Sequence, residues 1–158
     1  PIAFLVTDLT NRQFGKSRAR MVVLTGFFIA VALSIWLATP RIAIASGTAF
    51  LMAQLLDVSI FDRLRASTWW KAPLFSSLIG SALDTVIFFA LAFAPVFAML
   101  DFGGEPVSLG FGVPFLGVGG EVPLWISLAA GDFIVKIAVG LAMLVPYGIF
   151  AKRQIQHA

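Results

Sequence analysis

The sequence contains no cysteine and a single histidine, His157, in its C-terminal tail. The absence of cysteine excludes disulfides, thiolate-bound metals and cysteine nucleophiles. With one histidine at the end of the chain, neither a histidine-ligated metal site nor a histidine-based catalytic triad can form within the apolar segments. The enzyme motifs HExxH and GxSxG are absent as well. We therefore expect no metal, no cofactor and no enzymatic activity.

Charged residues are also scarce: they make up 12% of the chain, whereas hydrophobic residues make up 59%. Soluble domains carry about twice that share of charge, so the balance predicts an integral membrane protein. A formal net charge of +3 would suggest an anionic partner in a soluble protein, but here the basic residues lie between apolar segments. They are better explained by membrane orientation than by nucleic-acid binding.

The long apolar runs predict an all-α fold, a polytopic bundle of transmembrane helices in one membrane domain over residues 1–158. Each run is close to or above the roughly 20 residues that a helix needs to cross a bilayer. The predicted helices are 21–39, 42–61, 72–99 and 122–150, preceded by the end of an earlier helix over 1–9. A glycine-rich loop, 100–121, precedes the last helix. Because Pro1 falls inside an apolar run, we expect a further segment upstream.

Basic residues are distributed unequally between the two sides of the predicted bundle. Nine of the eleven lie on one side: Arg12, Lys16, Arg18, Arg20, Arg63, Arg65, Lys71, Lys152 and Arg153. By the positive-inside rule that side should be cytoplasmic. Thr7 or Asp8 is expected to cap a short helix that enters the first basic loop. Arg41 lies on the opposite side, where we expect it to snorkel to the outer surface.

Asp84 is the only ionisable residue within the predicted helix 72–99. It lies near mid-membrane, where a carboxylate costs about 3 kcal/mol on insertion scales. Small and polar residues recur every fourth position around it and so share one face: Ser76, Gly80 and Asp84, then Ser77, Ser81 and Thr85. That face should pack against other helices and not against lipid.

The last predicted helix carries Asp132 and Lys136 one turn apart, a spacing that favours an ion pair. Asp84 lies 13 residues past Lys71, and Lys136 lies 16 residues before Lys152. Both are therefore roughly 20 to 24 Å from the same side of the bundle. Two acids and one base are thus predicted to gather at mid-membrane, and the surplus charge can be met by a proton, a cationic substrate or hydrogen-bond donors. Whether these residues bind a ligand or only orient helices stays open.

The predicted helix 42–61 also has a polar face. Gln54 on that face either links helices or contacts a ligand. Asp57, close to the cytoplasmic end, is expected to form a local ion pair with one of the arginines that follow it, Arg63 or Arg65.

Four stretches of the sequence together resemble one known family, in the same order along the chain: TDLTNRQFGKSRAR, RIAIASGTAFLMAQLLDVSIFDRLR, WWKAPLFSSLIGSALDTVIFFALAF and GDFIVKIAVGLAMLVPYGIF. They are similar to the queuosine precursor transporter family, bacterial inner-membrane proteins of the vitamin-uptake-like group. The resemblance implies about six helices in the complete protein. It also implies uptake of 7-cyano- or 7-aminomethyl-7-deazaguanine into the cytoplasm, for making the modified tRNA base queuosine. Ser81 stands where the family is expected to carry asparagine, which makes it a candidate for setting substrate choice.

A deazaguanine is flat and carries adjacent N–H donors, which one carboxylate can accept in a bidentate way. Asp84 or Asp132 suits that role, Gln54 can read another edge, and aromatic side chains on the polar faces can contact the rings. The candidate substrate-binding residues are Asp84, Asp132, Lys136, Gln54, Ser81, Phe50 and Phe88.

No ATP-binding motif is present, so energy must come from a gradient, a partner or metabolic trapping of the substrate. The alternative is a structural or accessory subunit of a larger membrane complex. The sequence leaves open whether the chain forms a homo-oligomer or joins such a complex.

Overall fold

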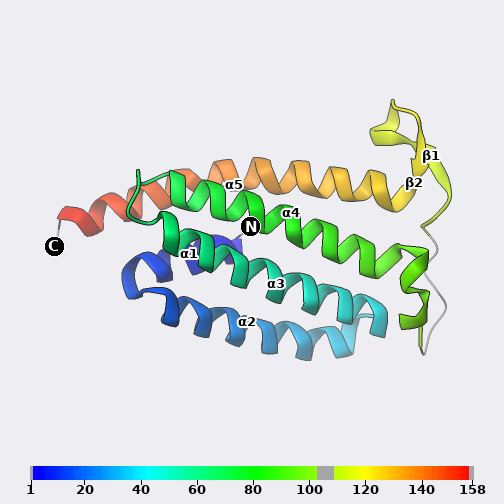
Figure 1. The fold of residues 1–158 in the computed structure, drawn as a ribbon, viewed down its shortest axis with the longest axis horizontal. Coiled ribbons are helices and arrows are strands. Elements are labelled where there is room, and N and C mark those ends of the chain that lie inside the picture. The colour runs from blue at the N-terminus through cyan, green and yellow to red at the C-terminus, as the bar shows by residue number, and fades with distance from the viewer. Residues whose placement is uncertain (1, 103–108, 157–158) are drawn as a thin grey trace.

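The computed structural model describes residues 2–102 and 109–156, with side chains described as far as residue 150. In this part of the chain the helices are α1 (Ile2–Phe14), α2 (Lys16–Leu37), α3 (Pro40–Leu64), α4 (Lys71–Phe93) and α5 (Leu124–Gln156). Figure 1 shows α2 to α5 as long rods lying side by side. These four are long and apolar enough to cross a membrane. The chain is therefore an all-α, multi-pass membrane protein.

The helix boundaries follow from a few residues at the turns. Gly15 separates α1 from α2 with a φ of 81°, a left-handed conformation that glycine adopts without a steric penalty. Thr39 caps α3 by accepting a hydrogen bond from the backbone N–H of Ile42, and Pro40 occupies the first helical position. As a result α2 begins at Lys16 and α3 at Pro40, earlier than the residues 21 and 42 predicted from hydropathy.

Thr7 and Asp8 lie inside the continuous helix α1 and cap nothing, so the expectation of a short capped helix there is wrong. The Thr7 hydroxyl donates to the backbone carbonyls of Ala3 and Phe4 on the preceding turn. Hydrogen bonding of this kind lets a threonine stay in a helix interior instead of starting a new helix.

The segment between α4 and α5 differs from the prediction at both of its ends. α4 ends at Phe93, six residues before the predicted end of the helix 72–99, and Pro95, which lacks an N–H group, opens a 3-10 helix, η1 (Pro95–Leu100). Further on, strands β1 (Gly112–Pro114) and β2 (Glu121–Pro123) form an antiparallel hairpin around a second 3-10 turn, η2 (Phe115–Gly117). Strands of three residues are too short to show a periodic pattern in the sequence.

Helices α3 and α4 form the centre of the bundle, with α2 packed on α3 and α5 on α4 (Figure 1). Small residues allow this close packing: Ala45, Ala49 and Ala53 of α3 are buried. A Cβ atom at Gly80 of α4 would lie 3.3 Å from the carbonyl oxygen of Ala53 and 2.9 Å from the ring of Phe4. Close contact at small residues is a common way for membrane helices to associate.

Arg41 does not snorkel to the outer surface as expected. It is buried, with 6% exposure, and its guanidinium lies 2.7 Å from Asp101 Oδ2. Its Nε and Nη2 atoms donate to the carbonyls of Leu91 and Ala94, 2.8 and 2.7 Å away. These carbonyls belong to the last turn of α4, where a helix lacks internal donors and favours a cation. Arg41 thus ties the start of α3 to the end of α4.

The basic residues predicted to share one side do so among the described side chains. The α1–α2 turn, the α3–α4 connection and the C-terminal end of α5 lie at the same end of the bundle in Figure 1. Arg12, Lys16, Arg63, Arg65 and Lys71 belong to that end. The opposite end carries the hairpin and the Arg41–Asp101 pair.

Candidate functional site

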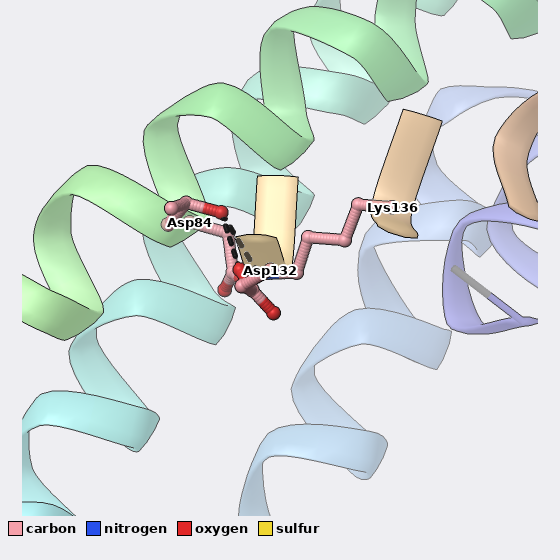
Figure 2. A network of polar contacts seen from close by, with 4 residues as sticks. Asp84, Asp132 and Lys136 are labelled. Carbon is pink, nitrogen blue, oxygen red and sulfur yellow. Dashed lines mark hydrogen bonds and ion pairs between the residues drawn. The ribbon is translucent and has the colours of Figure 1, made fainter. Parts of the chain in front are cut away.

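Lys136 of α5 is the centre of a polar cluster between α4 and α5 (Figure 2). Its Nζ lies 2.6 Å from Asp84 Oδ2 of α4 and 2.5 Å from Asp132 Oδ2, one turn away on its own helix. The third acceptor is the hydroxyl of Thr85, at 3.0 Å. Thr85 in turn donates to Asp132 Oδ2 at 2.6 Å. We call these four residues the Lys136 cluster.

The sequence predicted both the Asp132–Lys136 pair and the equal depth of Asp84, and the structure brings all three residues together. Helical geometry explains why this was predictable. A rise of about 1.5 Å per residue fixes depth, and a spacing of four residues fixes the pair on α5. The sequence pattern predicted Thr85 on the small, polar face of α4 but not as a member of this cluster.

The Lys136 cluster has two acids and one base, so it carries a surplus negative charge when all three are ionised. Lys136 uses its three donors on Asp84, Asp132 and Thr85, which satisfies the ammonium group. Both carboxylates are held through Oδ2, and this leaves their Oδ1 atoms as acceptors for another group. Exposure of the side chains, 25% for Asp84 and 33% for Asp132, shows that these acids are not closed off.

Ser81 lies with Lys136 in the wall of a partly open cavity between α1, α4 and α5. The cavity has a free volume of about 40 Å³, room for a few water molecules. Its lining continues along α5 to Tyr147, about 16 Å of helix rise from Lys136. At that far end the wall also includes Asp8 and Ser77.

The other predicted residues lie elsewhere. Gln54 of α3 is 2% exposed, and its Oε1 accepts a hydrogen bond of 3.2 Å from Thr7 of α1. Phe50 packs toward α2: a Cβ atom placed at Gly26 of that helix would lie 3.4 Å from the Phe50 ring. Phe88 of α4 packs edge to face with Phe89 and Phe93 of its own helix. The structure therefore unites only Asp84, Asp132, Lys136 and Ser81 of the predicted set around one place.

A second polar cluster lies where α1, α3 and α4 meet. It consists of six buried residues: Thr7, Asp8, Asn11, Gln54, Asp57 and Ser76. We call it the Asp57 cluster. The hydroxyl of Ser76 donates to Asp8 Oδ1 at 3.4 Å, and the amide of Asn11 donates to the carbonyl of Val58 at 2.9 Å.

Asp57 does not form the predicted ion pair with Arg63 or Arg65. It is fully buried, and neither carboxylate oxygen has a hydrogen-bond partner among the described residues. Arg63 is rotated about 240° around the helix from Asp57, and Arg65 is about 12 Å further along. Asp62 instead lies within 3.7 Å of Arg65 and 4.0 Å of Lys16.

Sequence reasoning missed the partners of Asp57, although Asp8 and Asn11 are three residues apart and so share a face of α1. That spacing was the available signal. Which helix this face meets depends on how three helices pack, and the pattern of one segment carries no information on that.

A model of the family described as "Putative vitamin uptake transporter" matches residues 32–150. The chain is 33% identical to the "Probable queuosine precursor transporter" of Haemophilus influenzae, over 94% of this chain and 64% of that protein. It is 31% identical to the "Queuosine precursor transporter" of Escherichia coli, over 94% of this chain and 68% of that protein. A "Probable queuosine precursor transporter" of Bacillus subtilis is 24% identical, over 98% of this chain and 69% of that protein. The chain thus spans about two thirds of the length of these curated relatives. No solved structure matches it.

Proposed function

This chain belongs to the vitamin uptake transporter family and, within it, to the queuosine precursor transporters, and we propose that the protein takes up 7-cyano- or 7-aminomethyl-7-deazaguanine. Uptake is across the bacterial inner membrane, into the cytoplasm. Support comes from the names of the relatives and from four helices suited to span a membrane.

The Lys136 cluster is the observation that carries the proposal. Asp84 lies near the middle of α4 and Asp132 about two turns after the start of α5. Both acids are partly exposed and keep oxygen atoms available after Lys136 is satisfied. A 7-deazaguanine offers adjacent N–H donors on its pairing edge, and hydrogen bonds to an ionised acceptor are about twice as strong as neutral ones. We assign substrate binding to Asp84 first, because Asp132 already accepts from both Lys136 and Thr85.

The surplus charge of the cluster also bears on substrate choice. An aminomethyl group on the deazaguanine is a cation at neutral pH and would balance the second acid, whereas a cyano group would not. Ser81 lines the same cavity as Lys136. We assign it a role in the choice between the aminomethyl and the cyano compound. Gln54 belongs to the Asp57 cluster and is therefore assigned to helix packing.

The basic end of the bundle is assigned to the cytoplasm. Positive residues in short loops favour that side during insertion. The hairpin and the Arg41–Asp101 pair then face the periplasm.

The test uses bacterial cells that cannot make queuosine precursors. They receive low concentrations of 7-cyano- or 7-aminomethyl-7-deazaguanine, and queuosine in tRNA is measured. The complete protein should restore the modified base, and Asp84→Asn should not, while both reach the membrane in equal amounts. Asp62→Asn is the matched control, because among the described side chains Asp62 pairs with Lys16 and Arg65, at the end of the bundle.

If the unmodified protein fails to restore queuosine with either compound, the proposed substrate is wrong. If Asp84→Asn restores it as well as the control does, the substrate site lies elsewhere. An effect of Asp84→Asn on membrane assembly but not on uptake would instead favour an accessory subunit.

A further inference from the structure

The Asp57 cluster holds two acids and no base. Asp8 is 2% exposed and Asp57 is fully buried, and their carboxyl groups face each other. Neither oxygen of Asp57 has a hydrogen-bond partner among the described residues, and the Oδ1 atom of Asn11 has none either. Because the Asn11 amide donates to Val58, its Oδ1 is held in place as a further acceptor. Three buried oxygen atoms therefore lack a donor.

The charged and titratable groups around this pair do not neutralise it. Arg12 of α1 donates to the hydroxyl of Tyr147 at 2.9 Å and lies over that ring. From α4, only the hydroxyls of Ser76 and Ser77 reach Asp8. Lys136 stands at the opposite end of the cavity and is bound to Asp84 and Asp132. Two adjacent buried carboxylates without a cation are strongly unfavourable, so the site requires a positive charge.

A proton fits this site better than a metal ion. In residues 2–102 and 109–156, no three histidine, cysteine or acidic side chains gather as metal ligands. A proton on one carboxyl turns an acceptor into a donor. A protonated Asp8 can then donate to the facing carboxylate of Asp57, whose oxygen atoms otherwise have no partner among the described residues.

The cavity extends from Asp8 of this pair to Lys136 of the Lys136 cluster. Asp8, Ser77 and Tyr147 line one end, and Ser81 and Lys136 line the other. Its free volume of about 40 Å³ holds a few water molecules, enough to begin a hydrogen-bonded path along the otherwise apolar wall.

We propose that Asp8 and Asp57 together bind one transported proton, and that the water-sized cavity links this proton to the substrate cluster, so that uptake is coupled to a proton gradient. In each cycle an O–H bond of the pair breaks, the proton leaves to water and a carboxylate remains until another proton binds. This inference rests on the proposed uptake of deazaguanines, for which it supplies the energy source.

The experiment uses the complete protein reconstituted in liposomes, with radiolabelled 7-cyano-7-deazaguanine as the probe. Internal pH is followed with a trapped pH-sensitive dye. Exchange of labelled for unlabelled substrate, which needs no gradient, is measured beside accumulation. With the interior more alkaline by about one pH unit, coupling to one proton should give up to about tenfold accumulation, with acidification of the interior.

Asp57→Asn keeps the shape of the side chain but cannot release a proton. It should lower accumulation from about tenfold to none and abolish proton entry, while exchange continues; Asp8→Asn should do the same. Asp62→Asn, five residues further along α3 in a surface ion pair, should accumulate substrate like the unmodified protein. Two separate variants guard against one that fails to fold.

Several outcomes would overturn the inference. One is exchange of substrate by the unmodified protein without any response to the pH gradient, and another is accumulation that follows a sodium gradient instead. Either result leaves the proposed uptake intact. Proton-coupled accumulation that persists in both Asp57→Asn and Asp8→Asn would show that the pair only joins helices. Absence of any exchange by the unmodified protein would overturn the proposed function, and this inference with it.

Discussion

The two polar clusters of this bundle contain the same acidic groups in opposite settings. In the Lys136 cluster each acid faces a lysine and is a quarter to a third exposed. In the Asp57 cluster two acids face each other without a base and are closed off by α1, α3 and α4. The first cluster is therefore open to a further polar group, as the proposed substrate site requires, whereas the second is closed to anything larger than a proton or water. Exposure and counter-charge, more than the residue types, separate the two roles.

Lys136→Met should have the largest effect on this contrast. It leaves Asp84 and Asp132 together without a cation, as Asp8 and Asp57 are now. Removing one partner of a buried ion pair lowers the free energy of unfolding by about 3 kcal/mol. Thermal unfolding in detergent should show this loss together with loss of uptake. Lys16→Met removes a 4.0 Å surface pair and serves as the control, with an expected change of under about 0.5 kcal/mol.

Asn11→Ala changes the Asp57 cluster and leaves the Lys136 cluster intact. It removes the hydrogen bond to the Val58 carbonyl, which keeps only its partner within α3, and it empties a buried polar site, at a cost of about 1.5 kcal/mol. Thermal unfolding should report that loss, while the affinity for 7-cyano-7-deazaguanine stays within about twofold, since Asn11 does not contact the Lys136 cluster. A large fall in affinity with unchanged stability would contradict the assignment of substrate binding to the Lys136 cluster alone.

Thr85→Val has the smallest expected effect. The substitution preserves shape but removes a hydroxyl that accepts from Lys136 and donates to Asp132. Loss of one such group from a partly exposed network costs about 1 kcal/mol, which corresponds to roughly fivefold weaker substrate binding. Equilibrium binding to the purified variant checks this, with Thr25→Val, whose hydroxyl bonds only within α2, as the matched control.

Much of the fold was predictable because apolar length alone specifies membrane-spanning helices. The boundaries were less so: charged residues at Lys16 to Arg20 hide the first turns of α2, which hydropathy assigns to a loop. The β1–β2 hairpin was missed because its strands have three residues each. Arg41 was misplaced because burial of an arginine depends on carbonyls of another helix, Leu91 and Ala94, which no local pattern reveals.

The two clusters also differ in how far the sequence predicts them. Asp84, Asp132 and Lys136 were predictable because depth is proportional to residue number in a straight helix. The Asp8–Asp57 pair was not, because it requires the relative rotation of α1 and α3, a result of packing at small residues such as Ala53 and Gly80. Phe50 and Phe88 show the same limit, since each turns toward a different neighbour than its polar face suggested.

The most direct test of the central claim is the affinity of purified protein for 7-cyano-7-deazaguanine, measured by titration calorimetry. Unmodified protein, Asp84→Asn and the control Asp62→Asn are compared, each with its unfolding temperature. A lost hydrogen bond to a charged acceptor is worth about 1.5 to 3 kcal/mol, so Asp84→Asn should bind about 10- to 100-fold more weakly, and Asp62→Asn should bind normally. Equal affinity in a folded Asp84→Asn protein would contradict the assignment of the Lys136 cluster as the substrate site.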